Sequence, residues 1–352
     1  MPVSGEFGMG EYARSLAIAQ GAAERWPRAS IRFILSRAAP YAAQLPFPAV
    51  LLASSPTFHS AAVIEAMNDW RPDIVIFDNA GRTAQLRAAR KIGARVVYIS
   101  ARRRQRNKAF RVSWMRLIDE HWIAYPEFIA GRLGFVERLK RNLLGRPAIR
   151  YLDVILTKTR ESLALRPGIA ADYVLMVPGG GTGHPGAGDA VEVFLQAARG
   201  LAALGVDTVL VGRVGTPSAV SEAAPGGSAD ALAAGSRAQL LGSLPQAELA
   251  GLMRGARLVI ANGGSTLLQS IACGRACVAV PIAGDQAERI SRCVDLGVAV
   301  AAPLAADAMV KLAADLWRDG ARIDALEGRA AALGLADGVD VALRAMTALL
   351  AT

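Results

Sequence analysis

The sequence holds little of the chemistry that builds disulfide frameworks or metal centres. Among its 352 residues are three cysteines, all between positions 273 and 293, and three histidines that lie far apart. The cysteines form no Cys-x-x-Cys pair and no histidine pair lies near them, which argues against a disulfide framework or a zinc site. We therefore predict buried free thiols, no metal and no cofactor.

Long apolar runs and aromatic residues are also scarce. No stretch reaches the roughly eighteen consecutive apolar residues of a membrane span. The opening residues, MPVSGEFGMGEYARS, do not place an apolar segment after a basic one, so nothing predicts export and the expected location is the cytoplasm. Only 6% of the residues are aromatic, too few for a basic platform with stacking aromatics, which disfavours nucleic acid as a partner.

The charge of +10 is spread unevenly over the chain. Residues 1–160 carry 26 Lys and Arg against 12 Asp and Glu, whereas residues 161–352 carry 14 against 18. The first part is expected to meet something anionic, such as a phosphate-bearing acceptor or an acidic lipid surface. Its segment ARRRQRNKAFRVSWMR, residues 101–116, joins a cationic run to aromatic residues, as in peripheral proteins on the inner face of a membrane. A solvated loop and helix face is the alternative.

Short β-branched runs alternate with amphipathic stretches, the pattern of βαβ units around parallel sheets. The predicted fold class is α/β, with two Rossmann-like doubly wound domains facing a cleft. The domains are placed at 1–160 and 172–335, with a linker at 161–171 and a closing helix at 336–352. Strands are predicted at 31–36, 73–78, 94–100, 172–181, 207–212, 257–264 and 277–284, with a weaker one at 153–158. The aromatic segment 118–128 is interpreted as a further strand rather than a stacking site.

The front of the chain is unusual for such a fold, because only MPVS precedes the glycine loop GEFGMGE. A parallel α/β domain normally opens with a strand that leads into this loop. Either the first strand is nearly absent or the start given is late.

The stretch RLVIANGGSTLLQSIA is arranged to bind phosphate. A strand, a glycine turn, two hydroxyls and a helix present backbone N–H groups and a positive helix end to an anion. Gly263 and Gly264 allow close approach, and Ser265 and Thr266 can cap the helix or bond phosphate oxygens. Gln269, one turn further, is expected to point to the same crevice and bond sugar hydroxyls. Helix capping alone is the simpler explanation of the turn.

Three further segments offer polar groups at expected strand ends. After CVAVPIAG come Asp285 and Gln286, a carboxylate and an amide that suit vicinal diols. The glycine-rich PGGGTGHPGAGD holds Gly180 and His184 and is interpreted as a loop of the donor site, or else as a plain turn. Asp78 ends the strand DIVIFD, where acceptor groups or a base would lie, with a helix N-cap as the alternative.

At these residues the chain resembles the GT-B glycosyltransferases, within them the branch of the lipid II GlcNAc transferase and the pseudaminic acid pathway nucleotide-sugar hydrolase. The likeness is strongest over residues 239–300 and is visible again at GMGEYARSLAIAQ. It implies that the C-terminal domain binds a nucleotide sugar, with Gly263 to Thr266 at the diphosphate, position 269 at the ribose, Asp285 and Gln286 at the donor sugar and the backbone of Leu244 at the base. In the front loop it implies phosphate or acceptor contacts from Gly8, Gly10 and Arg14.

Two positions depart from that family. Where its members commonly have Glu for the ribose, this chain has Gln269, which puts donor affinity or nucleotide choice in doubt. Where relatives have a histidine proposed as base, this chain has Glu11. A buried glutamate can act as a general base, but Glu11 can equally be a helix N-terminal carboxylate stabilised by the dipole.

The resulting hypothesis is a transferase that moves a sugar from a nucleotide-diphosphate sugar, expected to be a UDP-sugar, to an acceptor hydroxyl in cell-envelope or polysaccharide synthesis. The resemblance implies inversion. The helix end and an arginine such as Arg213 would neutralise the leaving group without a metal, and Glu11, Asp78 or His184 would activate the acceptor. The alternatives are a nucleotide-sugar hydrolase, a non-catalytic sugar-nucleotide-binding subunit and, third, a 2-epimerase.

Overall fold

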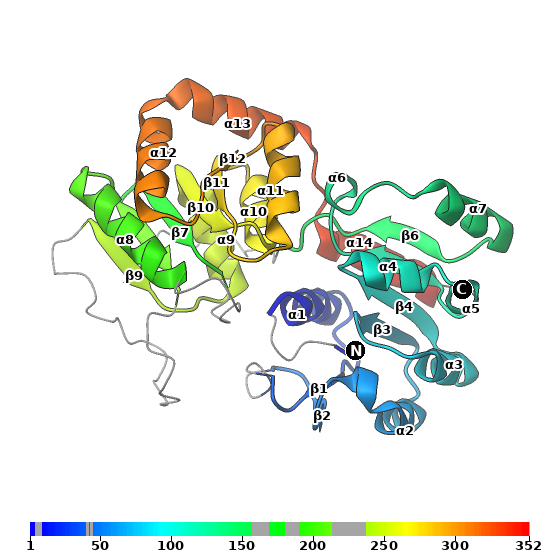
Figure 1. Ribbon diagram of the computed structural model, residues 1–352. Coiled ribbons are helices and arrows are strands. Elements are labelled where there is room, and N and C mark those ends of the chain that lie inside the picture. The colour runs from blue at the N-terminus through cyan, green and yellow to red at the C-terminus, as the bar shows by residue number, and fades with distance from the viewer. Residues whose placement is uncertain are drawn as a thin grey trace. The chain divides into compact units, whose positions relative to one another are not determined.

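The computed structural model describes residues 1–3, 9–39, 42, 45–156, 169–179, 190–212 and 237–351. The chain divides into two compact units, Met1–Ile155 with Ala336–Thr352, and Leu156–Leu335 (Figure 1). The last residues of the chain thus belong with the first unit.

Unit 1 is built on parallel strands. They are β1 (Phe33–Ser36), β2 (Ala49–Leu52), β3 (Ile74–Asp78), β4 (Arg95–Ser100), β5 (Glu120–Ile123) and β6 (Ala148–Tyr151). β3 to β6 form one sheet in chain order, and β1 pairs with β2. Five of the six residues of β4 are buried, four of them β-branched or aromatic, as expected for a strand covered on both faces.

The expected first strand survives as two residues. Pro2 makes an isolated parallel bridge to Ile34 of β1, and Val3 makes one to Asp78 of β3. Backbone hydrogen bonds from Val3 to Ile34 and from Asp78 to Pro2, both 3.0 Å, hold this segment between the two sheets. Residues 1–3 therefore link β1 to β3 through one bridge on each side.

Helices surround these strands. The longer ones are α1 (Met9–Arg25), α2 (Ser60–Trp70), α3 (Thr83–Lys91), α7 (Phe135–Leu144) and α14 (Gly338–Leu350). The shorter ones are η2 (Pro56–Phe58), α4 (Arg103–Ala109), α5 (Val112–Met115) and α6 (Glu127–Ala130). α14 packs on α1 through Ala17, Ala22, Val339 and Leu343. Gly21 lets the two helices approach, since a Cβ there would lie 2.7 Å from Val339.

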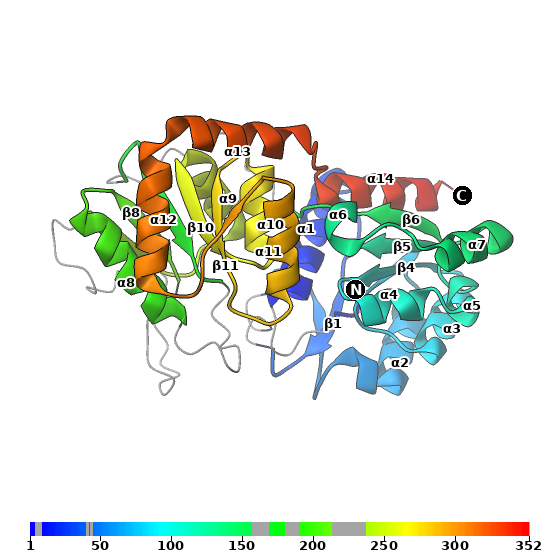
Figure 2. The ribbon, with the colours of Figure 1, turned by 45° about the horizontal axis from the view of Figure 1, so that its top comes forward.

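Unit 2 has one parallel sheet in the order β12-β11-β10-β7-β8-β9. Its strands are β7 (Val174–Val177), β8 (Thr208–Val211), β9 (Ala238–Leu241), β10 (Leu258–Asn262), β11 (Cys277–Val280) and β12 (Val300–Ala301). Its helices are α8 (Ala190–Ala203), α9 (Gln246–Gly255), α10 (Ser265–Ala272), α11 (Gln286–Asp295), α12 (Ala306–Arg318) and α13 (Gly320–Ala332). α8 and α12 lie side by side against the sheet (Figure 2).

Most predicted strands are confirmed, and three predictions need correction. The segment 153–158 is no strand in its described part, where Val154 makes only an isolated bridge to Asp337. β2, β6, β9 and β12 had not been predicted. Within residues 101–116 the side chains of Phe110, Trp114 and Met115 are buried, so this segment presents its charge to solvent but not its aromatic rings.

The three cysteines of the sequence all lie in unit 2, and Cys273 is half-buried. All three cysteines are free, and Cys277 and Cys293 are buried in unit 2. Among the described residues, no group of three or more His, Cys, Asp or Glu could hold a metal ion. Of the helices in the described ranges, none combines the length and the apolar character of a membrane span.

His121 makes unit 1 sensitive to acid. Its ring is fully buried, Nε2 lies 2.8 Å from the Ser100 hydroxyl, and burial together with the nearby Arg106 charge lowers its pKa from 6.5 to about 3. Between these pKa values the unfolded chain binds a proton that the folded chain does not, so stability falls as pH falls below 6.5. Between pH 7 and pH 5 this group should cost about 2 kcal/mol of unfolding free energy.

The test is urea unfolding at pH 7 and pH 5. His121→Gln can keep the hydrogen bond to Ser100 but has no proton to gain, so its loss of stability over this pH range should be about 2 kcal/mol smaller than that of the wild type. An equal loss in both proteins would show that His121 does not titrate in this way.

Candidate functional site

The strand order of unit 2 indicates where a crevice forms. The chain runs from β7 outward through β8 and β9, then returns to β10 beside β7 and continues to β11 and β12. In open parallel sheets, a crevice forms at the carboxyl ends of the strands where the order reverses. Here that point lies between the ends of β7 and β10.

Asn262, the last residue of β10, ties the two strand ends together. Its side-chain amide donates to the carbonyl of Pro178 after β7, at 2.8 Å, and its oxygen accepts from the amide of Gly264, at 2.7 Å. Gly179 and Gly264 must lack a side chain here, because a Cβ at either would collide with the Asn262 side chain. Sequence reasoning missed this residue, although it opens the NGGST turn.

Gln286 has a different task from the predicted one. Its side chain is 5% exposed, and its Oε1 accepts from the amides of Gly263, at 3.2 Å, and Ile282, at 3.0 Å. Arg289 donates to the carbonyl of Gly263 from the same helix. A Cβ on Gly263 would lie 2.6 Å from Ile290, so the turn packs directly on α11. Gln286 therefore shapes the loop through its Oε1. Its predicted contact with the donor sugar stays a prediction.

The backbone amides that stay available to an anion lie in the first turn of α10 rather than at the two glycines. The amide of Gly263 is bonded to Gln286 and to the carbonyl of Val280, and that of Gly264 to Asn262. α10 has no side-chain cap, and the first amides of a helix have no partner within it. Ser265 is exposed and Thr266 half-buried, so their amides and hydroxyls are the groups that can meet a phosphate.

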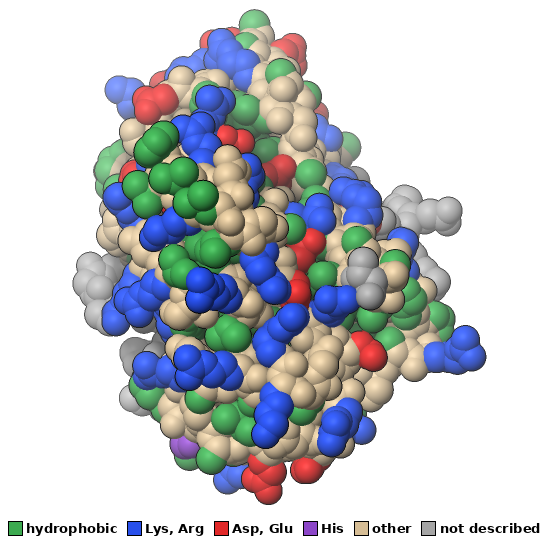
Figure 3. Space-filling model, turned by 90° about the vertical axis from the view of Figure 1, so that its right-hand side faces the viewer, with side chains coloured by type: hydrophobic (Ala, Val, Ile, Leu, Met, Phe, Trp, Pro, Cys, Tyr) green, Lys and Arg blue, Asp and Glu red, His purple; other side chains and the backbone are tan. Residues whose placement is uncertain are grey.

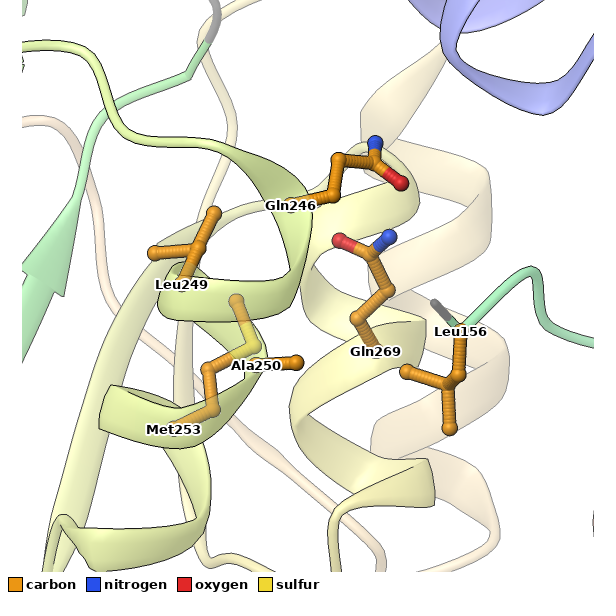
Figure 4. A pocket seen from close by; sticks show the side chains of 6 residues that line it. All are labelled: Leu156, Gln246, Leu249, Ala250, Met253 and Gln269. Carbon is orange, nitrogen blue, oxygen red and sulfur yellow. The ribbon is translucent and has the colours of Figure 1, made fainter. Parts of the chain in front are cut away.

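A small pocket lies between α9 and α10, lined by Leu156, Gln246, Leu249, Ala250, Met253 and Gln269. The amide groups of Gln246 and Gln269 lie near one another at one end, and apolar side chains form the rest (Figure 4). Leu244 is half-buried in the loop that leads from β9 into α9. Gln269 thus lies one turn beyond the anion site, and Gln246 adds an amide that sequence reasoning did not single out.

Asp285 precedes α11 and is open to solvent. Its side chain is 70% exposed, and its carboxylate lies 3.5 Å from the guanidinium of Arg289, one helical turn away. Arg289 is largely buried, but the carboxylate itself is open to solvent and can accept hydrogen bonds from hydroxyl groups.

In unit 1, Asp78 has no access to a substrate. It is fully buried, and its carboxylate accepts from Arg14 Nη2 at 2.6 Å, Arg14 Nε at 3.0 Å and the Ser15 hydroxyl at 2.9 Å. Burial raises its pKa, and the Arg14 charge and hydrogen bonds oppose that effect. Three donors on two oxygens fit an ionised carboxylate, which only accepts. This geometry corrects the catalytic role predicted for Asp78, its alternative as a helix cap, and the ligand contact predicted for Arg14.

Glu11 lies beside this pair and remains accessible. Its Oε1 accepts from the side-chain amide of Asn79 at 2.8 Å, and the Asn79 oxygen accepts from the amide of Ala101 at 3.0 Å. Asn79 adopts a left-handed backbone with φ of 51°, a conformation that asparagine tolerates well. Glu11 is thus a half-buried carboxylate held by one fixed donor, on the first turn of α1.

Four predicted site residues, Gly8, Gly180, His184 and Arg213, lie outside the described residues. Gly10 is described and lies in the first turn of α1.

No family model matches the sequence, and no curated protein matches it. Solved structures match over nearly the whole chain. The glycosyltransferase VinC in complex with dTDP has a TM-score of 0.65 at 12% identity, covering 98% of this chain and 96% of that one. UGT2 of Phytolacca americana, complexed with UDP-2fluoro-glucose and pterostilbene, has 0.63 at 15%, covering 99% and 98%. MurG of Acinetobacter baumannii has 0.57 at 16%, covering 92% of both.

The chain has the fold of these glycosyltransferases. The predicted resemblance to GT-B proteins is confirmed at the level of the fold.

Neighbouring variants can separate the loop-shaping role of Gln286 from that of Asp285. Gln286→Met keeps the size of the side chain but removes the acceptor of two backbone amides, so the free energy of unfolding should fall by about 1–3 kcal/mol. Asp285→Asn, at the next position and exposed, should change it by less than about 0.5 kcal/mol. Urea unfolding at pH 7 measures both, and equal stability of the two variants would contradict the assignment.

Proposed function

We propose that the protein is a glycosyltransferase that binds a nucleotide-diphosphate sugar on unit 2. The observation that supports this most is that the uncapped first turn of α10 and the pocket-lining Gln269 lie on the same helix, one turn apart. A helix N-terminus followed by an amide-lined pocket suits a diphosphate followed by a ribose and a base. Two structural neighbours were solved with such compounds, VinC with dTDP and UGT2 with UDP-2fluoro-glucose.

Each part of the donor has a proposed contact. The amides and hydroxyls of Ser265 and Thr266 bind the diphosphate, and Gln269 binds the ribose hydroxyls. The backbone of Leu244 contacts the base, and Asp285 accepts hydrogen bonds from the sugar hydroxyls.

Stabilisation of the departing diphosphate is the catalytic contribution of unit 2 in this proposal. The α10 dipole and the buried Arg289, which donates to the Gly263 carbonyl, place positive potential behind the turn. Preoriented groups of this kind need no rearrangement as negative charge develops on the leaving group. The proposal therefore requires no metal ion.

Unit 1 supplies the acceptor side. Glu11 removes the proton from the acceptor hydroxyl, and that oxygen attacks the anomeric carbon as the bond to the diphosphate breaks. Attack from the face opposite the leaving group inverts the configuration. The surplus of basic residues in unit 1 suits a phosphate-bearing or lipid-linked acceptor of the cell envelope.

Binding of a nucleotide is the first test. UDP, dTDP, GDP, CMP and their common sugars are screened by thermal shift, because a ligand of the folded state raises Tm by mass action. We expect UDP or dTDP compounds to give the largest shift, and the absence of any shift would overturn the proposal. With the bound donor, products formed with and without acceptor distinguish transfer from hydrolysis.

Gln269 provides a sharper test of the nucleoside contact. Gln269→Leu should weaken binding of the best nucleoside diphosphate about tenfold, equivalent to about 1.4 kcal/mol, because the ribose loses its hydrogen-bond partner. Affinity for inorganic pyrophosphate should stay unchanged, since the first turn of α10 is intact. Gln196→Leu, an exposed position on α8, serves as the matched control in calorimetry. Loss of pyrophosphate affinity in Gln269→Leu would argue against the proposed division of the site.

Glu11 is tested by its amide. Glu11→Gln can still accept the hydrogen bond from Asn79 but cannot take a proton, so kcat should fall by roughly 10²–10⁴-fold with an unchanged donor Kd. Glu24→Gln, exposed on the same helix, should retain full activity. If Glu11→Gln keeps wild-type kcat, Glu11 is only a helix N-terminal carboxylate.

A further inference from the structure

α7 in unit 1 is an amphipathic helix whose apolar side faces solvent instead of the core. None of its side chains is buried, and four of them are large apolar groups exposed to solvent. Phe135 is 73% exposed and Leu143 76%, with Val136 and Leu139 also exposed. Amphipathic helices of globular proteins normally turn such residues toward the core.

The polar contacts of α7 show which side faces the protein. Glu137 receives two hydrogen bonds from Arg106, at 3.1 and 2.7 Å, and one from the amide of Gly134 at 2.8 Å. Arg106 is itself buried and also donates to the carbonyls of Ala130, Gly131 and Arg132. The acidic residue of α7 therefore points inward, to a buried arginine.

The helical period places the apolar residues away from Glu137. At about 100° per residue, the four apolar side chains fall within an arc of about 100°, whose edges lie about 100° and 160° from Glu137. Arg138 follows one edge of this stripe and Lys140 the other. An apolar stripe with a cationic residue on each side is typical of helices that lie in the surface of a membrane.

The surroundings of α7 carry the same charge. Residues 101–150 contain 13 Lys and Arg and four Asp and Glu. Each of the four acids is in an ion pair, namely Asp119 with Arg146, Glu120 with Arg150, Glu127 with Arg132 and Glu137 with Arg106. On the neighbouring α4 and α5 region, Arg103, Arg104, Arg111 and Arg116 are exposed. Figure 3 shows this side of the molecule, where hydrophobic side chains gather among many Lys and Arg.

We propose that α7 is an interfacial anchor that lays Phe135, Val136, Leu139 and Leu143 into the surface of an anionic bilayer, with the surrounding arginines on the lipid phosphates. The inference stands on unit 1 alone and does not depend on sugar transfer. Charge complementarity selects the occupant: an acidic lipid surface neutralises the unpaired cations, whereas a second copy would set two such surfaces against each other. Val112, exposed on α5 next to α7, extends the apolar area.

Sedimentation of the full chain with sucrose-loaded vesicles tests the anchor. Vesicles of phosphatidylcholine with roughly one-third phosphatidylglycerol are compared with pure phosphatidylcholine, since anionic lipid supplies the attraction. We expect at least about tenfold stronger binding to the anionic vesicles, decreasing with salt. Equal binding to both, or none to either, would overturn the proposal.

Two sets of variants separate the apolar from the electrostatic contribution. Phe135→Ser with Leu143→Ser should reduce binding to anionic vesicles about tenfold or more, without loss of fold because both side chains are exposed. Arg111→Gln, Arg116→Gln and Arg138→Gln together should remove the preference for anionic lipid. The matched control is Leu204→Ser with Leu350→Ser, two half-exposed leucines elsewhere, which should bind like the wild type.

Sedimentation equilibrium of the same proteins distinguishes the other occupant. The wild type and the Phe135→Ser, Leu143→Ser variant should have the same mass in solution. A wild-type dimer that the variant loses, together with no vesicle binding, would assign the stripe to a second copy and overturn the membrane proposal.

Discussion

The buried ion pair between Arg14 and Asp78 is the interaction on which the geometry of unit 1 depends. In space, β1 and β3 are bridged by residues 1–3, which make few ladder hydrogen bonds. These bonds alone give little support to the position of α1. The two hydrogen bonds of Arg14, with that of Ser15, instead fix α1 to the end of β3. Loss of one partner of such a pair costs about 3–5 kcal/mol, because the other charge stays buried. The neighbouring residues, Glu11 on α1 and Asn79 after β3, meet as a consequence.

In unit 2, the loops at the strand ends are held mainly by neutral side-chain amides rather than by an ion pair. The carbonyl of Pro178 and the amides of Gly263, Gly264 and Ile282 all receive side-chain partners, from Asn262 or Gln286. The side-chain amides of Asn262 and Gln286 are uncharged, so they leave the positive end of α10 available to an anion. A glycine turn that binds its own protein this way is rigid before any ligand arrives, which lowers the entropy lost on binding.

Most strands and the loops that follow them could be predicted because they depend on local sequence: β-branched runs form buried strands, and NGGST follows the carboxyl end of one of them, β10. The tasks of individual side chains could not. Arg14 and Asp78 are 64 positions apart and Gly263 and Gln286 are 23 apart, and in both cases a polar residue near a strand end fits a ligand contact as well as a structural one. β2, β6, β9 and β12 escaped prediction because they are only partly buried, whereas β7 and β11, no longer than β2, are buried throughout.

The two basic and apolar segments of unit 1 show why burial cannot be read from amphipathicity. Residues 101–116 and α7 both combine cations with large apolar side chains, yet Phe110, Trp114 and Met115 are buried, whereas the apolar residues of α7 are exposed. The difference comes from one long-range contact, in which Arg106 leaves the cationic surface, enters the interior and binds Glu137. Because that ion pair turns the Glu137 side of α7 toward the protein, the apolar stripe on the other side faces solvent. A charge pattern thus indicates a surface for an anionic partner, but the internal ion pairs decide which segment presents it.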